Sequence, residues 1–516
     1  MIARCFSGAV NGVAASTVEI EVYTQISTSS FAIVGLPDTA IKEARDRIPS
    51  ALKNSGFPFK EEYEVTVNLA PADLKKEGPI YDLPIALGLL ATTKEIPAEN
   101  LEDYGMAGEL ALSGEVRSVH GLLPIVMEMR RIGKKKMIVP YANRKEASVV
   151  EGIEIIPVKT LREAASYLKG EFTIEPVYTN LEELVREDAE SYEDFADVKG
   201  QSTVVSAIEV AVAGGHNILM MGSPGSGKTM IARRIPSILP PMTVDEALEV
   251  SSIHSVAGKD SGFRNFITTR PFRSPHHSSS AIALVGGGAK ALPGEVSLAH
   301  RGVLFLDEFA EFPRSVLEIL RQPIEDGKVS VARALGAHDY PSRFMLVAAM
   351  NPCPCGYFGD DTHDCHCTMP RIESYQNRIS GPLLDRIDIK IAVKAVPVRD
   401  LQTATAGRSS KELRENVLRA RAIQAERYKN MPGVHTNAEV RSRDLFLVCN
   451  MDAAAKHFMD IYLESNKLSA RSYDRMLRVA RTVADLNGRE QVEESDVYYA
   501  SGLREMCKAN SRGALI

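Results

Sequence analysis

Residues 222–229 read Gly-Ser-Pro-Gly-Ser-Gly-Lys-Thr, and this run is the strongest structural signal in the 516-residue chain. It follows residues 217–221, which predict a buried strand, and precedes residues 229–239, which predict a helix. Glycines let the backbone turn sharply between the two, so that N–H groups and the helix N-terminus face phosphate oxygens. The sequence therefore predicts a nucleotide site in an α/β core with a parallel sheet.

Two side chains of this loop have distinct expected roles. Lys228 is expected to reach the β- and γ-phosphates, and Thr229 to offer its hydroxyl to Mg²⁺. The expected phosphate-loop residues are Gly222, Ser223, Pro224, Gly225, Ser226, Gly227, Lys228 and Thr229.

Polar side chains also end two later strands. An apolar strand over residues 302–306 ends in Asp307 and Glu308, and a strand over residues 344–350 ends at Asn351. The carboxyl ends of parallel strands face the ligand in open α/β sheets. We expect Asp307 to hold Mg²⁺, Glu308 to polarise the attacking water, and Asn351 to orient that water or to sense the γ-phosphate.

Two arginines are candidates for contacts with the γ-phosphate. Arg386 lies at a helix end within residues 381–388, away from the phosphates of its own chain, so its expected role is to act on a neighbouring subunit in a ring. Arg471 opens a helix from which a lid would touch the nucleotide. A surface salt bridge is the alternative role for each arginine.

The composition indicates a globular protein of several domains. A total of 61 Lys and Arg residues against 67 Asp and Glu residues gives a formal net charge of −6. This charge excludes a globally basic nucleic-acid coat but not a local basic channel. The longest apolar stretch, residues 83–91, is far shorter than the ~20 residues that span a bilayer, and the N-terminus lacks an apolar secretory segment. We expect a cytoplasmic protein without a membrane partner.

Composition divides the chain into blocks. Residues 1–170 alternate strand-like and helical stretches and predict an α/β or α+β fold, with strands over residues 18–22, 63–69 and 136–140 and a helix over residues 39–54. Residues 171–196 are an acidic linker, or else a charged surface helix at a domain boundary. Residues 197–398 repeat strand–turn–helix units, and residues 399–516 are strongly helical.

Four of the seven cysteines lie within fifteen residues, as Cys353, Cys355, Cys365 and Cys367. Four thiolates close together form a tetrahedral Zn²⁺ site, and such a closed site is structural because no position is left for water. Unligated cysteines packed as small apolar side chains are the alternative.

The order of these motifs resembles that of AAA+ ATPases. Residues 270–277, 293–300 and 351–356 resemble the magnesium-chelatase-like branch, and together with the N-terminal block they resemble the ComM/YifB family over nearly the whole chain. The resemblance implies a homohexameric ATPase that uses ATP and Mg²⁺ to translocate on DNA. Its substrate would be single-stranded or branched DNA, and its activity that of a branch-migration helicase in homologous recombination or natural transformation.

The resemblance also implies roles for single positions. By position, Asn351 matches the first sensor of the family, Arg386 the arginine finger and Arg471 the second sensor, while the last block matches a small helical lid. The positions that match the adenine side are Val198, Gly200 and Gln201.

The family inserts segments that face the ring's pore, and here these would be residues 263–288 and a hairpin over residues 326–340. Their basic side chains would follow a phosphate backbone, unless the hairpin is an ordinary surface feature. The candidate DNA contacts are Arg273, Lys328 and Arg333.

The N-terminal block resembles the Lon-protease-like domain, but without its catalytic pair. Ile80 stands where that domain carries its nucleophilic serine, and Ile125 stands where it carries its lysine base. Since peptide hydrolysis needs an ionisable nucleophile and a base, we expect no peptidase activity.

Two other functions compete with a DNA motor. One is a chelatase-type motor that drives metal insertion into a tetrapyrrole, which the His276–His277 pair favours. The other is an ATP-dependent protein-remodelling enzyme. Stimulation of the ATPase by DNA distinguishes the DNA motor from both.

Overall fold

The computed structural model describes residues 2–27, 30–59, 62–99, 101–179, 193–258, 266–288, 291–333, 336–396, 406–466 and 469–505. They form two compact units. The first unit holds Met1–Arg186, Thr243–Thr268 and Ala332–Tyr340, and the second holds Glu187–Met242, Thr269–Val331 and Pro341–Ile516. Half of the predicted acidic linker, residues 180–192, lies outside the described residues. None of the described helices is both long and apolar enough to cross a membrane.

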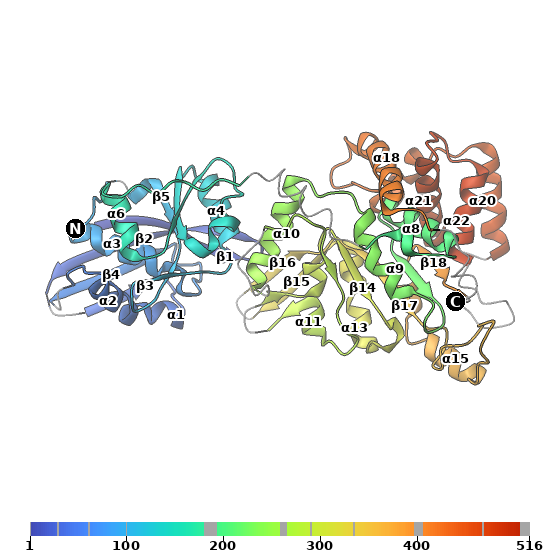
Figure 1. Cartoon of the computed structure of the whole chain (residues 1–516), viewed down its shortest axis with the longest axis horizontal. Helices are drawn as coiled ribbons and strands as arrows, with labels where there is room; N and C mark the ends of the chain where they lie inside the picture. The colour runs from blue at the N-terminus through green and yellow to red at the C-terminus, as the bar shows by residue number, and fades with distance from the viewer. Residues whose placement is uncertain are drawn as a thin grey trace. The chain divides into compact units, whose positions relative to one another are not determined.

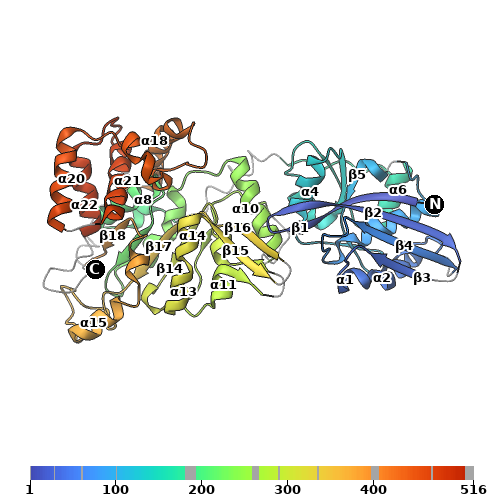
Figure 2. The same ribbon diagram turned by 180° about the vertical axis from the view of Figure 1, so that it is seen from behind.

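The first unit is built on a seven-stranded mixed sheet in the order β3-β4-β2-β1-β5-β8-β9. β1 and β2 form a long antiparallel pair in which Ile2 lies opposite Tyr23 (Figure 2). The three predicted strands are present, although the first is longer than predicted. The strands are β1 (Ile2–Asn11), β2 (Ala14–Ile26), β3 (Ser30–Val34), β4 (Tyr63–Ala70), β5 (Tyr104–Met106), β8 (Lys136–Pro140) and β9 (Glu154–Val158), with a separate small pair of β6 (Glu109–Leu110) and β7 (Val116–Arg117).

Helices α3 and α4 pack against β1 and β2 of this sheet. Every residue of α3 is buried, so the apolar run at residues 83–91 is a core helix. The helix predicted over residues 39–54 is interrupted by a turn at Glu43. The helices are α1 (Thr39–Lys42), α2 (Ala44–Asn54), α3 (Asp82–Thr92), α4 (Leu122–Arg131), α5 (Arg144–Ala147), α6 (Leu161–Lys169) and α10 (Val244–Ala257).

Helix α10 belongs to the first unit, although it lies within the block that composition assigned to the nucleotide core. It packs against α4, and the carbonyl of Ser255 accepts a hydrogen bond of 3.1 Å from the backbone N–H of Gly121. Composition along the chain carries no sign of such a contact between distant segments. The division seen in the structure therefore follows long-range packing and differs from the predicted block boundaries.

The second unit contains a five-stranded sheet in the order β11-β14-β17-β10-β18, in which all neighbouring strands are parallel. This confirms the predicted α/β core with a parallel sheet. The strands are β10 (Ile218–Met221), β11 (Phe272–Arg273), β14 (Val303–Leu306), β17 (Met345–Met350) and β18 (Ile389–Ala392), and Figure 1 labels most of them. Because β10, β14 and β17 are buried throughout, they read as unbroken apolar runs.

Short helices connect these strands. The helix predicted over residues 229–239 is α9 followed by a 3₁₀ turn at Ile235–Ile238, which contains Pro236. Proline lacks the N–H that an α-helix would use there. The helices are α8 (Ser202–Gly214), α9 (Lys228–Arg234), α11 (Ala281–Val285), α12 (Glu295–Leu298), α13 (Arg314–Ile319), α14 (Arg321–Asp326), α15 (Met369–Gln376) and α16 (Gly381–Leu384). A small strand pair of this unit is β12 (Gly286–Gly287) with β13 (Leu292–Pro293). The predicted hairpin is the pair of β15 (Lys328–Arg333) and β16 (Gly336–Pro341), of which β16 is grouped almost entirely with the first unit.

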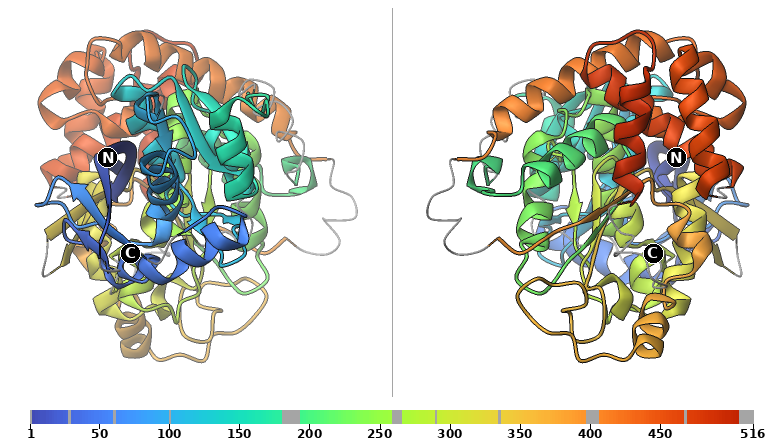
Figure 3. Two further views of the ribbon diagram at one scale, coloured as in Figure 1. Left: turned by 90° about the vertical axis from the view of Figure 1, so that its left-hand side faces the viewer. Right: turned by 90° about the vertical axis from the view of Figure 1, so that its right-hand side faces the viewer.

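The C-terminal part of the second unit is helical, as predicted. Figures 1 and 3 show its helices gathered in one group, coloured orange to red. They are α18 (Ser410–Tyr428), α19 (Leu445–Val448), α20 (Ala453–Asn466), α21 (Ala470–Leu486) and α22 (Glu494–Glu505).

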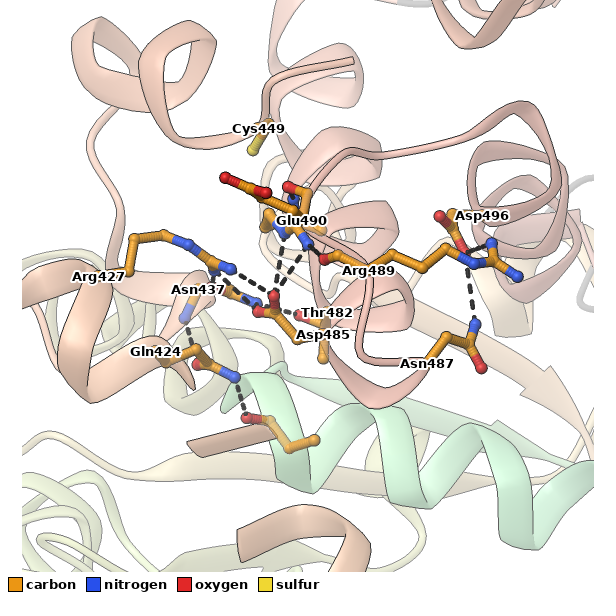
Figure 4. Close-up of polar contacts among 12 residues, drawn as sticks. Gln424, Arg427, Asn437, Cys449, Thr482, Asp485, Asn487, Arg489, Glu490 and Asp496 are labelled. Atoms are coloured by element: carbon orange, nitrogen blue, oxygen red, sulfur yellow. Dashed lines mark hydrogen bonds and ion pairs between the residues drawn. The ribbon is translucent and has the colours of Figure 1, made fainter. Parts of the chain in front are cut away.

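A buried polar network holds two of these helices together. Asp485 of α21 accepts hydrogen bonds from Arg427 (2.5 and 2.9 Å), Arg481 (3.1 Å) and Asn437 (2.9 Å), and Figure 4 shows Arg427 and Asn437 reaching it. Arg481 also donates to the carbonyls of Glu490 and Arg489. Buried charges are tolerated only when they are paired and hydrogen-bonded, and this network meets both conditions.

Candidate nucleotide-binding site

The phosphate-binding loop joins β10 to α9 in the second unit. Gly225 and Gly227 have φ of +79° and +90°, in the left-handed region that favours glycine. At Gly222 a side chain would bring its Cβ to 2.1 Å from the carbonyl oxygen of Val393, so only glycine fits. The backbone of the loop therefore requires glycine at these three positions of the sequence pattern.

Lys228 begins α9 and points its ammonium back into the loop. Its Nζ donates to the carbonyls of Gly222 (2.7 Å) and Ser223 (2.9 Å) and to Oδ1 of Asn351 (3.3 Å). Burial lowers the pKa of Lys228 to about 8, against the opposing effect of the Asp307 carboxylate. The cation and Asn351 thus meet at the ends of adjacent strands β10 and β17, as the sequence predicted.

Thr229 and Asp307 also meet, although 78 positions separate them in the chain. The Thr229 hydroxyl donates to Oδ2 of Asp307 at 2.7 Å, and Oδ1 of Asp307 accepts from the backbone N–H of Glu308 at 2.9 Å. A hydroxyl and a carboxylate are the hard oxygen ligands that Mg²⁺ prefers beside nucleotide phosphates. These two residues fit the metal site predicted for them.

Glu308 follows β14 with its backbone in the left-handed region, at φ 51° and ψ 44°. Such a conformation costs energy in a residue other than glycine and is found most often at functional sites. Its exposed carboxylate lies 2.8 Å from Nδ1 of His277, whose ring packs on that of His276 with centroids 4.1 Å apart. This contact between His277 and Glu308 was not predicted from the sequence, although the two consecutive histidines are a visible signal.

The residues assigned to the adenine side lie next to the phosphate loop. The Gln201 amide donates to the carbonyls of Ser226 (2.8 Å) and Lys394 (3.2 Å), so it links the loop to the segment after β18. Val198 is buried, and Gly200 has a φ of +70°.

Within the described residues, no hydrogen bond or ion pair joins either predicted arginine to the phosphate-binding loop or to Asp307. Arg386 is paired with Glu325 and donates to the carbonyl of Pro382 at 2.7 Å. Arg471 lies exposed in the first turn of α21. Within one chain, Arg386 therefore takes the salt-bridge alternative, and its action on a neighbouring subunit stays a prediction.

The candidate DNA contacts have different surroundings. Arg273 of β11 forms an ion pair of 2.6 Å with Glu295. This carboxylate neutralises the positive charge that a contact between Arg273 and DNA phosphates would need. Lys328 is exposed at the start of β15. The side chain of Arg333 and residues 263–265 of the first proposed insert lie outside the described residues.

The Lon-like block has aliphatic side chains where a protease would need its catalytic pair. Ile80 lies buried in the turn Pro79–Tyr81, and Ile125 lies buried in α4. An aliphatic side chain provides neither a nucleophile nor a base.

The four clustered cysteines come together after β17. Their sulfur atoms all lie within 4.8 Å of one another. The Sγ atom of Cys353 is 3.3 Å from that of Cys355 and 3.7 Å from that of Cys365, and the last two are 3.6 Å apart. This set is a candidate metal centre.

Comparison with known families matches most of the chain. The family described as "Magnesium chelatase, subunit ChlI" matches residues 194–401. The families "Subunit ChlI of Mg-chelatase" and "Magnesium chelatase, subunit ChlI C-terminal" match residues 18–143 and 407–504.

Individual relatives extend this similarity. The chain is 41% identical over 513 residues to "Competence protein ComM" of Haemophilus influenzae, and the match covers 98% of each chain. It is 40% identical over 496 residues to the uncharacterised protein YifB of Escherichia coli, covering 96% of this chain and 94% of the relative. It is also 30% identical over 123 residues to Lon protease 2 of Bacillus subtilis, covering 24% of this chain and 22% of that protein.

Proposed function

The chain belongs to the magnesium-chelatase-like ComM/YifB family of AAA+ proteins, and from this we propose that it is an ATP-driven DNA motor. In the proposal, a homohexameric ring acts on single-stranded or branched DNA in recombination or transformation. One observation carries it: Lys228, Thr229 and Asp307 converge at one edge of the sheet, in a chain similar along its whole length to a competence protein.

The site residues would divide the work of ATP hydrolysis. Bound Mg²⁺, held by Thr229 and Asp307, would neutralise charge on the β- and γ-phosphates. Lys228 would bind the same phosphates, and Asn351 would orient the attacking water. Glu308 would accept a proton from that water as it attacks the γ-phosphorus, and ADP leaves. His277, which lies 2.8 Å from Glu308, would hold this carboxylate in position.

The remaining parts of the proposal concern assembly. The helices from α18 to α22 would form the lid over the nucleotide, with Arg471 as its contact. Arg386 would exchange Glu325 for the γ-phosphate of a neighbouring subunit. Lys328 and Arg333 would follow the DNA backbone in the ring, which we place in the cytoplasm.

The test is the ATPase rate of the purified chain with and without single-stranded, duplex and four-way-junction DNA. We expect the rate to rise with DNA and the stimulation to fade with added salt, because phosphate contacts release counterions. Lys228→Ala is the control for contaminating ATPases. A rate that does not respond to any of these DNAs at low salt, with rings confirmed, would refute the DNA motor.

A second candidate is a metal-insertion motor, which the three magnesium-chelatase family matches favour. The histidine pair is no longer an argument for it, because His277 contacts Glu308. Its test is ATP-dependent insertion of magnesium into protoporphyrin with partner subunits supplied. Protein remodelling would instead appear as loss of a folded protein substrate.

A further inference from the structure

We propose that Cys353, Cys355, Cys365 and Cys367 bind one Zn²⁺ ion that holds the segment between the two cysteine pairs against the phosphate-binding loop. Zinc occupancy would then set the affinity for nucleotide. The second part of this proposal depends on the nucleotide site of the proposed function, whereas the first part does not.

The sulfur geometry fits a zinc site. Zinc binds thiolates at ~2.3 Å, so the edges of a tetrahedral four-sulfur site are about 3.8 Å long. The distances of 3.3, 3.6 and 3.7 Å among the Sγ atoms of Cys353, Cys355 and Cys365 are close to this value. A disulfide needs a sulfur separation of about 2.0 Å, and all four cysteines are free. Four thiolates also fill a tetrahedral site, so the metal would be structural.

The segment between the cysteine pairs touches the phosphate-binding loop at two places. At Gly356, whose φ is +90°, a Cβ would lie 2.6 Å from Cδ of Pro224, so the backbone of Gly356 packs directly against the proline ring. Further along, a hydrogen bond from the Ser223 side chain is the largest of the effects that lower the pKa of Asp360. Two neighbouring residues of the phosphate-binding loop, Ser223 and Pro224, therefore both contact the segment between the cysteine pairs.

This segment has little regular structure of its own to fix these contacts. Residues 351–368 contain no helix or strand, and α15 begins only at Met369. The carboxylate of Asp360 accepts from the backbone N–H groups of Thr362 (2.8 Å) and His363 (3.0 Å), which shapes one turn. Closing a loop costs entropy that a metal bridge offsets. Without the metal, the segment that carries Asp360 would move more freely, and the contact between Asp360 and Ser223 would be weakened.

The first measurement is the metal content of the full chain, purified under reducing conditions without added metal. We expect one zinc ion per chain, and we expect Co²⁺ substitution to give the absorption of a tetrahedral thiolate site. The double variant Cys365→Ser/Cys367→Ser should lose the zinc. The matched control Cys449→Ala, a buried cysteine of the same unit outside the cluster, should keep it.

The second measurement is the Kd of a non-hydrolysable ATP analogue. We expect the double cysteine variant to bind about ten-fold more weakly, the effect of losing one hydrogen bond to a charged group. Asp360→Ala should weaken binding of the ATP analogue similarly while retaining one zinc per chain. This variant still tests the link between the cysteine segment and nucleotide affinity if the double cysteine variant does not fold.

The possible outcomes separate the two parts of the proposal. Absence of zinc and of Co²⁺ binding in the wild type would overturn the metal site. If the wild type binds zinc but the Kd for the ATP analogue is unchanged in both the double cysteine variant and Asp360→Ala, the proposed link between zinc and nucleotide affinity would be overturned. A wild type that binds zinc but no nucleotide would refute the proposed ATPase and leave the zinc site standing.

Discussion

At the scale of single residues, the charge of Lys228 links nucleotide binding to pH. Burial lowers its pKa to about 8, below the ordinary lysine value of 10.5. ATP phosphates favour the charged form, so binding raises this pKa. Affinity is then fully present below pH 8 and falls as pH rises above it, by up to about ten-fold per unit. The measurement is titration calorimetry with a non-hydrolysable analogue between pH 7 and 9.5, which should also show proton uptake above pH 8.

Lys228→Arg is the control for this pH dependence. A guanidinium stays charged throughout the range, so the affinity of this variant, although lower, should not change with pH. A wild-type affinity that is constant up to pH 9.5 would mean that Lys228 remains charged without nucleotide.

A second prediction concerns Glu308. Glu308→Gln should bind ATP with nearly unchanged affinity and hydrolyse it roughly 10²- to 10⁴-fold more slowly, because the amide cannot accept a proton from water. The measurements are Kd and single-turnover hydrolysis. Glu311→Gln is the control: Glu311 lies three residues after Glu308 but pairs with Arg378, so its replacement should leave hydrolysis intact. Loss of ATP binding in Glu308→Gln would show that this carboxylate has a different role.

The sequence predicted most of the site residues because each follows an apolar strand at a fixed spacing. Lys228, Thr229, Asp307 and Asn351 meet as expected, since parallel strands bring their carboxyl ends to one edge. The pairing of His277 with Glu308 was missed because it joins β14 to an irregular segment after β11. No periodicity marks such a contact.

At the scale of elements, α21 is joined to α18 through one carboxylate. Asp485→Ala would leave Arg427 and the fully buried Arg481 without their anion. Removing one partner from a buried charge network costs about 3–5 kcal/mol, so the melting temperature of the C-terminal helices should fall by several degrees. Thermal unfolding followed by circular dichroism gives the shift. Glu490→Ala is the control, because only the carbonyl of Glu490 joins the network, and an equal shift there would rule out a special role for Asp485.

Element types were easier to predict than element partners. Apolar runs identified β10, β14 and β17, and helical spacing identified α18 and α21. The position of β10 between β17 and β18 could not be predicted from the sequence, because strand order depends on contacts between distant segments. The same limit explains why the packing of α10 on α4, which groups α10 with the first compact unit, was not predicted from the sequence.

At the scale of the whole molecule, one chain brings together the residues proposed for Mg²⁺, water and phosphate, whereas within the described residues its two candidate arginines form no hydrogen bond or ion pair with them. Arg386 is bound to Glu325, and Arg471 is exposed. An arginine near the γ-phosphate contributes largely to phosphoryl transfer, so a site without one would be slow. A ring of identical subunits can supply the arginine across a heterologous interface, because each subunit presents a different surface to each neighbour.

Mixing two inactive variants tests this arrangement. Arg386→Ala keeps Glu308 but gives its neighbour no arginine, whereas Glu308→Gln gives the arginine but has no base. If Arg386 acts on a neighbour, random mixing in equal amounts creates complete sites at about a quarter of the interfaces, and ATP hydrolysis returns although each variant alone is inactive. If Arg386 acts within its own chain, every site in the mixture lacks one group, and the rate stays at the level of the separate variants. Mixing Arg386→Ala with Lys228→Ala should restore the rate in the same way, since Lys228 and Glu308 belong to one site, whereas mixing Glu308→Gln with Lys228→Ala should restore nothing.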